Sequence, residues 1–193
     1  MSIAQLAVTF FLILDPLGNV PAFLAILKNF DAKAQRRIII REMLIALGVI
    51  LLFNFFGNEI LKLIGIGQST VLIAGGIILF LIALQMIFPK ESLESNTKNL
   101  EDPFIVPLAI PLIAGPSIIG AVMVYAYEVN DSFVTTISLI IAWIASLIIL
   151  MSSSFLQRIL GKRVLAAGER LMGFIMTIIA LDLFNRGIVL LVK

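Results

Sequence analysis

Two groups of proline and glycine residues lie inside long apolar stretches, where helix-breaking residues are unusual. Asp15–Pro21 reads DPLGNVP and Pro111–Pro116 reads PLIAGP, so both contain the pattern P-L-x-x-x-P. Proline in a helix interior costs roughly 3 kcal/mol, and glycine adds about 1 kcal/mol. Each group therefore predicts a break in a helix. Inside a membrane such a break is tolerated only against protein or a polar cavity, so the pair of breaks predicts a binding site.

The second proline of each pattern is expected to begin a second half-helix, near Pro21 and Pro116, because proline is favoured at the first helical position. The start of a helix presents free N–H groups and about half a positive charge, which suits the carboxylate of a small substrate. The preceding half-helices are expected to end near Leu14 and Ile110, where their carbonyl oxygens suit an ammonium group or a cation. A simple proline kink is the alternative for either break alone.

Asp15 is the side chain best suited to chemistry in these stretches. A carboxylate at the middle of a bilayer costs roughly 2.5–3.5 kcal/mol on insertion scales. Asp15 is able to cap the next helical turn, or to bind a substrate ammonium group, a coupling cation or a proton. We favour a role in binding, because an uncharged serine or asparagine caps a helix equally well.

A second acidic residue, Asp182, is also a candidate for ion coupling. Asp182 and Arg186 are spaced i,i+4, so they are predicted to form an ion pair that faces the bundle. Gln85 corresponds to Asp182 in the internal repeat described below. The predicted substrate-binding residues are Asp15, Pro16, Gly18, Asn19, Pro21, Pro111, Gly115, Pro116, Ser117 and Gln85.

The chain that must position these residues is too apolar for a soluble domain. Hydrophobic residues make up 61% of its 193 residues and charged residues 13%, against about a quarter charged in soluble proteins. Six stretches are long enough to cross a hydrocarbon core about 30 Å thick. They are Ser2–Leu27, Ile38–Phe56, Leu63–Pro89, Phe104–Tyr127, Ser132–Gln157 and Leu171–Val192. We predict an all-α membrane protein of six transmembrane helices in one domain, residues 1–193, with the first and fourth spans discontinuous.

The chain contains an internal repeat. Gly76–Gln85 (GIILFLIALQ) and Gly173–Asp182 (GFIMTIIALD) are identical at five of ten positions, and the two P-L-x-x-x-P patterns are separated by nearly the same offset. We predict two repeats of three spans, about 1–90 and 103–193, joined by a linker at 89–103. An odd number of spans inserts the second copy in the opposite orientation, and inverted repeats are typical of secondary transporters.

Basic residues are concentrated after the first, third and fifth spans, which places those loops, including the linker, in the cytoplasm and both termini outside. Arg41 and Glu42, at the cytoplasmic end of the second span, are expected to extend toward the interface. The net charge of +2 does not indicate a nucleic-acid partner. The chain has no histidine or cysteine, which excludes disulfides, thiol nucleophiles, imidazole bases and most zinc or haem ligation. We predict no cofactor and no enzymatic activity.

The motifs DPLGNVPAFLAI at Asp15–Ile26, AGGIILFLIALQMIF at Ala74–Phe88 and AIPLIAGPS at Ala109–Ser117 resemble those of the MarC family of membrane proteins. The resemblance implies six spans arranged as two inverted repeats. It also implies sodium-independent, proton-linked movement of small neutral amino acids such as glycine and alanine, an activity of part of the family. Other members were named through a link to antibiotic resistance.

The leading functional hypothesis is a secondary transporter in the cell membrane that works by alternating access. Its partners are then the lipid bilayer, a small amino acid and a proton, with Asp15 as the carrier and sodium less expected. Export of amino acids or other small solutes is an alternative, and a channel is a second. An intramembrane enzyme is disfavoured because the sequence offers no convincing nucleophile–base pair.

Overall fold

The computed structural model describes residues 1–28, 30–88, 113–129 and 131–192. The described residues are helical, with no strand among them, as predicted. The helices are α1 (Ile3–Leu14), α2 (Pro16–Leu27), α3 (Ala32–Ile64), α4 (Gln68–Ile87), α5 (Pro116–Val129), α6 (Ser132–Met151) and α7 (Ser153–Val192). Gly161, at φ 68°, interrupts the helical backbone of α7.

Five of the predicted spans are confirmed as helices long and apolar enough to cross a membrane. These stretches are Ile3–Leu27, Ala32–Ile64, Gln68–Ile87, Ser132–Met151 and Ala166–Val192. The end of the predicted fourth span forms a shorter apolar helix, Pro116–Ala126. Residues 104–112 of that span, and the predicted linker, lie outside the described residues.

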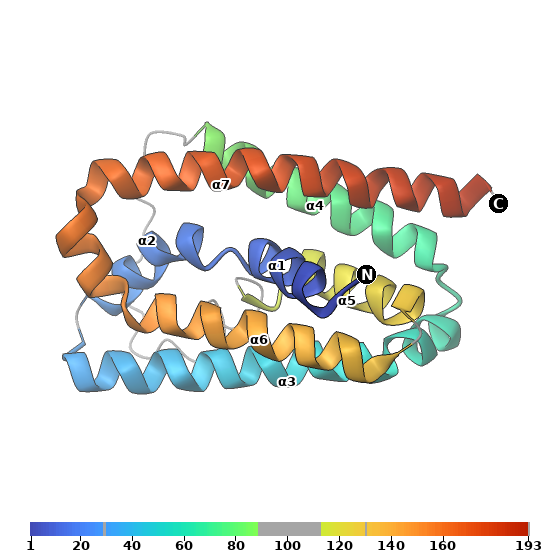
Figure 1. The fold of residues 1–193 in the computed structure, drawn as a ribbon, viewed down its shortest axis with the longest axis horizontal. Coiled ribbons are helices and arrows are strands. Elements are labelled where there is room, and N and C mark those ends of the chain that lie inside the picture. Colours follow the sequence, from blue (N-terminus) through green and yellow to red (C-terminus); the bar gives the residue numbers. More distant parts are fainter. Residues whose placement is uncertain (29, 89–112, 130, 193) are drawn as a thin grey trace.

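The helices run along one long axis and form three layers in the view of Figure 1. Helices α4 and α7 form one outer layer, α3 and α6 form the other, and α1, α2 and α5 lie between them (Figure 1). Large side chains from all three layers fill the core, among them Phe10, Phe23, Met43, Ile50, Leu79, Leu139 and Leu183. The middle layer, which contains the first P-L-x-x-x-P pattern and the last proline of the second, Pro116, is therefore enclosed by the outer helices.

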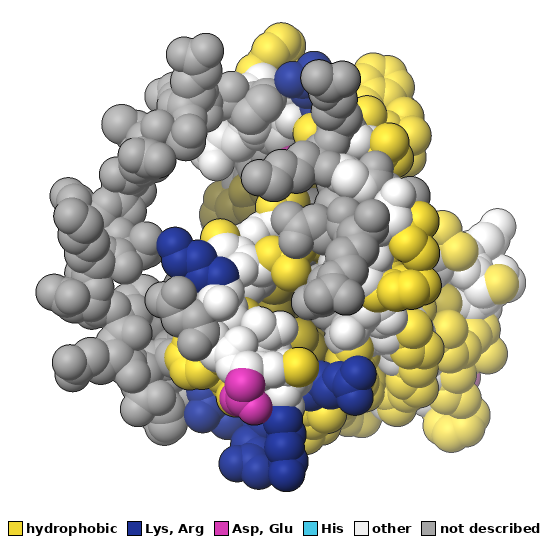
Figure 2. All heavy atoms as spheres, turned by 90° about the vertical axis from the view of Figure 1, so that its left-hand side faces the viewer, with side chains coloured by type: hydrophobic (Ala, Val, Ile, Leu, Met, Phe, Trp, Pro, Cys, Tyr) yellow, Lys and Arg dark blue, Asp and Glu magenta, His cyan; other side chains and the backbone are white. Residues whose placement is uncertain are grey.

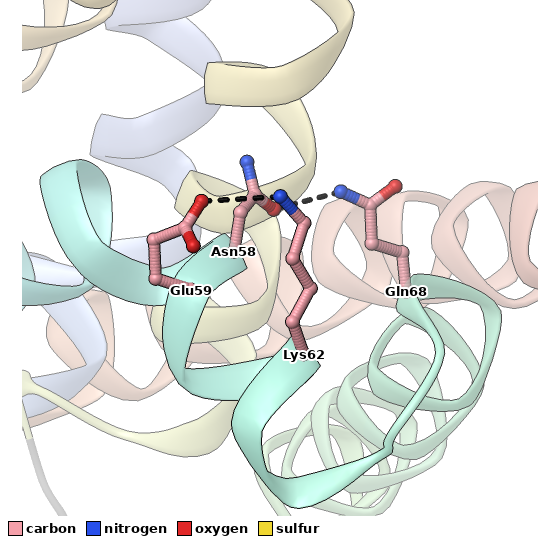
Figure 3. A network of polar contacts seen from close by, with 4 residues as sticks. All are labelled: Asn58, Glu59, Lys62 and Gln68. Carbon is pink, nitrogen blue, oxygen red and sulfur yellow. Dashed lines mark hydrogen bonds and ion pairs between the residues drawn. The ribbon is translucent and has the colours of Figure 1, made fainter.

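Helix α3 is longer than the second predicted span, Ile38–Phe56. No proline interrupts its sequence, so the helix continues past Gly57 and ends where Gly65 adopts a left-handed conformation at φ 76°. Gln68 at the start of α4 donates to Asn58 of α3 at 2.7 Å and so bridges the turn, and Lys62 pairs with Glu59 at 3.1 Å within the last turns of α3 (Figure 3). This turn lies at the end of the bundle opposite to the start of α3 (Figure 1).

Helices α4 and α7 approach closely because glycines occupy their contact. A Cβ atom at Gly76 would lie 2.9 Å from the Ala180 carbonyl oxygen and 2.9 Å from the Phe184 nitrogen. A Cβ atom at Gly173 would lie 3.0 Å from the Ala83 carbonyl oxygen and 3.0 Å from a side-chain carbon of Ile87. Small residues allow such backbone contact between membrane helices.

Basic side chains gather at one end of the bundle, which is the face shown in Figure 2. Exposed lysines and arginines come from the end of α2, the start of α3 and the early part of α7: Lys28, Lys33, Arg36, Arg37 and Arg170. The fold thus collects these five described basic residues at one end of the bundle.

Candidate functional site

Helices α1 and α2 meet at Asp15, the residue that begins the first motif. Asp15 has φ 43° and ψ 59°, and it is the one described non-glycine residue with a positive φ. Proline disfavours the helical conformation in the residue before it, and aspartate is one of the few residues that tolerate the left-handed region. The dipeptide Asp15-Pro16 therefore ends α1 at Leu14 and begins α2 at once.

The expectation that the second helix begins near Pro21 was wrong. Pro16 takes the first position of α2, and Pro21 lies inside that helix with an exposed side chain. Pro16 satisfies the N-terminal preference of proline five residues earlier than expected. Pro21 then costs one hydrogen bond, to the carbonyl of Leu17, without stopping the helix.

At this junction, side chains of the motif form hydrogen bonds with backbone groups at the end of α1 and at the start of α2. The Gly18 N–H donates to Asp15 Oδ1 at 3.1 Å, so Asp15 caps α2. Asn19 Nδ2 donates to the Leu14 carbonyl at 3.0 Å, so Asn19 occupies an acceptor at the end of α1. Asp15 is 7% exposed. The first turn of α2 thus holds a buried carboxylate of its own chain, where a substrate carboxylate had been expected.

Gly18 is the residue that makes this junction compact. A Cβ atom at Gly18 would collide with the Asp15 carboxylate and would lie 2.6 Å from Met86 Cε of α4. Glu169 of α7 is close enough to act electrostatically on Asp15. The sequence did not single out Met86 or Glu169, because contacts between helices leave no local signal.

The second motif begins α5 at Pro116, as predicted. Ser117 and Gly115 are buried, and the Ile119 N–H donates to the Gly115 carbonyl at 3.1 Å. A Cβ atom at Gly75 of α4 would lie 3.6 Å from the Pro116 carbonyl oxygen, so α4 packs on the first turn of α5. Predicted site residue Pro111 lies outside the described residues. The junction of α1 and α2 and the start of α5 both lie near the middle of the long axis of the bundle (Figure 1).

The predicted ion pair between Asp182 and Arg186 is formed, with Arg186 Nε 2.7 Å from Asp182 Oδ2. Arg186 lies over the ring of Tyr125 at 5.6 Å, and Tyr125 meets the ring of Phe10 edge-on at 5.8 Å. The Asp182 side chain is 49% exposed and that of Arg186 33%, so the expectation that the pair faces the bundle was wrong for Asp182. Gln85 is exposed as well. Hydrogen bonds and ion pairs between described residues join neither Asp182 nor Gln85 to Asp15.

Glu42 is a buried acidic residue that the sequence analysis did not place in any site. Its side chain has 0% exposure, whereas the neighbouring Arg41 side chain has 40%. Arg41 alone therefore extends toward the surface, and the expectation that Glu42 does the same was wrong. Glu42 Oε2 and Asn54 Oδ1, both on α3, are buried without a hydrogen-bond partner among the described residues. Whether a helix residue faces the bundle depends on its neighbours, which hydropathy does not specify.

Within the described part of the chain, no group of three or more acidic residues comes together in a way that could hold a metal ion. The described features of the site are the junction of α1 and α2, with the buried carboxylate of Asp15, and the start of α5 at Pro116.

The chain is similar in sequence to one family of membrane proteins and to several individual proteins from named organisms. A family model described as MarC family integral membrane protein matches residues 1–192. The UPF0056 inner membrane protein YhgN of Escherichia coli K12 is 46% identical over 190 residues, which cover 96% of this chain and 95% of YhgN. The UPF0056 membrane protein BU449 of Buchnera aphidicola from Acyrthosiphon pisum is 46% identical over 178 residues, covering 92% and 91%. A UPF0056 membrane protein of Chlamydia pneumoniae is 36% identical over 188 residues, covering 95% and 92%. No solved structure matches.

Proposed function

Since the chain belongs to the MarC family of integral membrane proteins, we propose that it is a secondary transporter of small neutral amino acids such as glycine and alanine, which works by alternating access and couples transport to protons. One observation carries the proposal: a buried carboxylate, Asp15, lies at a junction of two helices inside the candidate span Ile3–Leu27. Interrupted helices whose termini face a substrate near the middle of the membrane are typical of secondary transporters.

The proposed site divides the two charged groups of an amino acid between the two junctions. Asp15 is the partner of the ammonium group, because it is the buried carboxylate of the first junction. The start of α5, at Gly115–Ser117, is the partner of the carboxylate, because the N–H groups of a helix N-terminus attract anions. Asp15 already occupies the start of α2, so the second junction is the better anion site. Pro111 and Gln85 remain predicted members of the site.

The contacts between α4 and α7 support the proposal of inverted repeats. In the internal alignment Gly76 corresponds to Gly173, and Ala83 corresponds to Ala180. Gly76 contacts Ala180, and the equivalent residues in the opposite repeats, Gly173 and Ala83, also contact each other. The two contacts are therefore related by exchange of the repeats. A pseudo-two-fold axis between the two helices accounts for this reciprocity. We therefore propose repeats at about 1–90 and 103–193 within one membrane domain, with the first and fourth spans discontinuous.

The charge distribution supports an orientation. The basic end of the bundle (Figure 2) is proposed to face the cytoplasm, which puts the linker 89–103 there and both termini outside. The E. coli relative is named an inner membrane protein, and we propose the cell membrane for this chain.

Uptake into proteoliposomes tests the function directly. A panel of labelled amino acids is offered to the reconstituted protein under an imposed proton gradient or an imposed sodium gradient. The proposal expects saturable uptake of glycine and alanine that the proton gradient drives and that sodium does not change. It also expects counterflow, in which unlabelled amino acid inside the vesicle drives entry of labelled amino acid. Uptake that neither saturates nor shows counterflow would indicate a channel, and the absence of any uptake would refute the assignment.

A further inference from the structure

The first part of α7 runs across the basic end of the bundle instead of along it. In Figure 1 this part, coloured orange, crosses the left-hand end of the bundle, and the remainder of α7 then follows the long axis. The helix is kinked at Gly161, which has φ 68° and ψ 164°, a backbone that glycine adopts without steric cost. Helix α7 thus consists of a transverse segment, 153–160, and a part along the long axis that contains the candidate span Ala166–Val192.

The transverse segment exposes two large apolar side chains. Phe155 and Ile159 are each 64% exposed, and their i,i+4 spacing puts them on the same face of the helix. Many apolar residues of the spans are exposed because they face hydrocarbon, but the candidate span of α7 begins only at Ala166. A helix that lies in the plane of the membrane buries such a face at the boundary between lipid headgroups and acyl chains.

The same end of the bundle carries basic side chains without ion pairs. Four of them are exposed around the connection from α2 to α3: Lys28, Lys33, Arg36 and Arg37. The ion pairs between described residues involve none of these four. Residues 28–37 contain one acidic residue, Asp31, which accepts from the Ala34 N–H at 3.3 Å and caps α3. This stretch therefore carries an excess of positive charge that no described ion pair neutralises.

The sequence around the transverse segment has the same sign of charge. Residues 153–165 contain three basic residues and no acidic one. Arg170, also exposed at this end, follows Glu169 in α7. At the opposite end of the bundle, by contrast, Lys62 is paired with Glu59 at 3.1 Å. The exposed apolar face of the transverse segment and the unpaired positive charge thus occur together at one end.

An anionic phospholipid matches both features of this end. Its phosphate group complements the basic side chains, and its acyl chains cover an apolar helix face. The positive-inside bias by itself accounts for the basic residues and not for the exposed Phe155 and Ile159. An acidic soluble protein would complement the charge, but it offers no hydrocarbon beside it. Charge complementarity next to an apolar face therefore favours lipid as the occupant.

We propose that the basic end of the bundle is a binding surface for anionic phospholipids. The transverse segment lies in the membrane interface, with Phe155 and Ile159 among the upper acyl chains, and the exposed side chains of Lys28, Lys33, Arg36 and Arg37 contact lipid phosphates. The inference does not depend on transport, because it concerns the surface of the bundle and not the two P-L-x-x-x-P patterns.

The depth of the transverse segment is measured with nitroxide labels. Phe155→Cys and Ile159→Cys are labelled in the otherwise cysteine-free chain and reconstituted in vesicles that contain phosphatidylglycerol. Oxygen concentrates among acyl chains and a nickel chelate stays in water, so both labels should be more accessible to oxygen. Ile178→Cys, exposed within the span, and Ala32→Cys, exposed at the start of α3, are the references for lipid and water. Greater access to the chelate at 155 and 159 would overturn the proposal. Low access to both reagents would also overturn it, because protein would then cover this face.

Lipid preference is measured by native mass spectrometry of the purified protein in detergent, titrated with phosphatidylglycerol or phosphatidylcholine. The wild type should bind more phosphatidylglycerol, and Arg36→Gln/Arg37→Gln should lower that binding about fivefold or more while phosphatidylcholine binding stays unchanged. Arg36→Lys/Arg37→Lys keeps the charge and should keep the preference. Lys62→Gln, at the opposite end, is the matched control and should keep it as well. No preference in the wild type, an undiminished preference in Arg36→Gln/Arg37→Gln, or an equal loss in Lys62→Gln would overturn the proposal.

Discussion

Gly76 on α4 lies against the backbone of Ala180 on α7, so closely that a Cβ atom at Gly76 would be 2.9 Å from the Ala180 carbonyl oxygen. Because the obstacle is backbone, a larger residue cannot be accommodated by moving a side chain. The same holds for Gly173 against Ala83 at 3.0 Å. The close packing of α4 on α7 therefore depends on two glycines. Gly76 of α4 contacts the backbone of α7, and Gly173 of α7 contacts the backbone of α4.

Replacing Gly76 with alanine is expected to destabilise the protein by about 1–3 kcal/mol, the usual cost of overpacking a core. Gly48 on α3 is the matched control, because a Cβ atom there meets nothing within 4 Å, and alanine favours a helix over glycine. Thermal unfolding in detergent should show a lower midpoint for Gly76→Ala and an unchanged or higher midpoint for Gly48→Ala. Equal midpoints for the two variants would contradict the packing argument.

Asp15→Asn separates the charge of this residue from its role as a cap. An asparagine oxygen also accepts from the Gly18 N–H, so the variant should fold and reach the membrane. Gradient-driven amino acid uptake should be abolished, because the buried negative charge that binds an ammonium group or a proton is gone. Uptake assays with protein levels checked by immunoblot measure this. Wild-type uptake by Asp15→Asn would leave Asp15 with only its capping role.

Gly18→Val is expected to reduce uptake severely, because the added side chain collides with the Asp15 carboxylate and with Met86 Cε. Shortening the neighbour in Gly18→Val/Met86→Ala removes one obstacle and leaves the carboxylate displaced, so uptake should stay low. Uptake and thermal stability are measured together. Recovery of uptake in the double variant would show that contact with Met86, and not the position of Asp15, was the cause.

Recognition of the substrate carboxylate by the start of α5 is tested with modified amino acids. An amino acid amide or methyl ester should compete far more weakly than the free acid for uptake of labelled glycine, because a neutral group gains little from a helix N-terminus. Ser117→Ala should have a milder effect on binding than Gly115→Val, since backbone N–H groups supply the interaction. Equal competition by the ester would refute carboxylate recognition at this junction.

The proposed orientation predicts which residues a membrane-impermeant thiol reagent reaches. The chain has no cysteine, so single cysteines at Ser2, Lys33 and Ser132, all exposed, need no background variant. In intact cells the reagent should label positions 2 and 132 and should not label position 33. Labelling of position 33 alone would mean that the basic end of the bundle faces outward.

The sequence by itself determined five of the six predicted spans and the end of α1. A span needs only a sufficient length of apolar residues, and this property belongs to the segment alone. The end of α1 at Leu14 follows from Pro16, whose effect on the preceding residue is local. The i,i+4 pairing of Asp182 with Arg186 was predictable for the same reason. Even here, two prolines in one motif competed for the start of α2, and Pro16 rather than Pro21 occupies it.

Only the tertiary structure decided which faces of these helices meet. In a nearly uniformly apolar sequence, the hydrophobic pattern does not distinguish a face against lipid from a face against protein. The full burial of Glu42, the contact of Met86 with Gly18, the approach of Gly76 to Ala180 and the exposure of Asp182 all depend on such faces. Each joins residues far apart in the chain, or leaves a residue exposed instead of packed against another helix. Helix–helix packing, which composition and local spacing do not encode, is the physical reason that these features appear only in the folded chain.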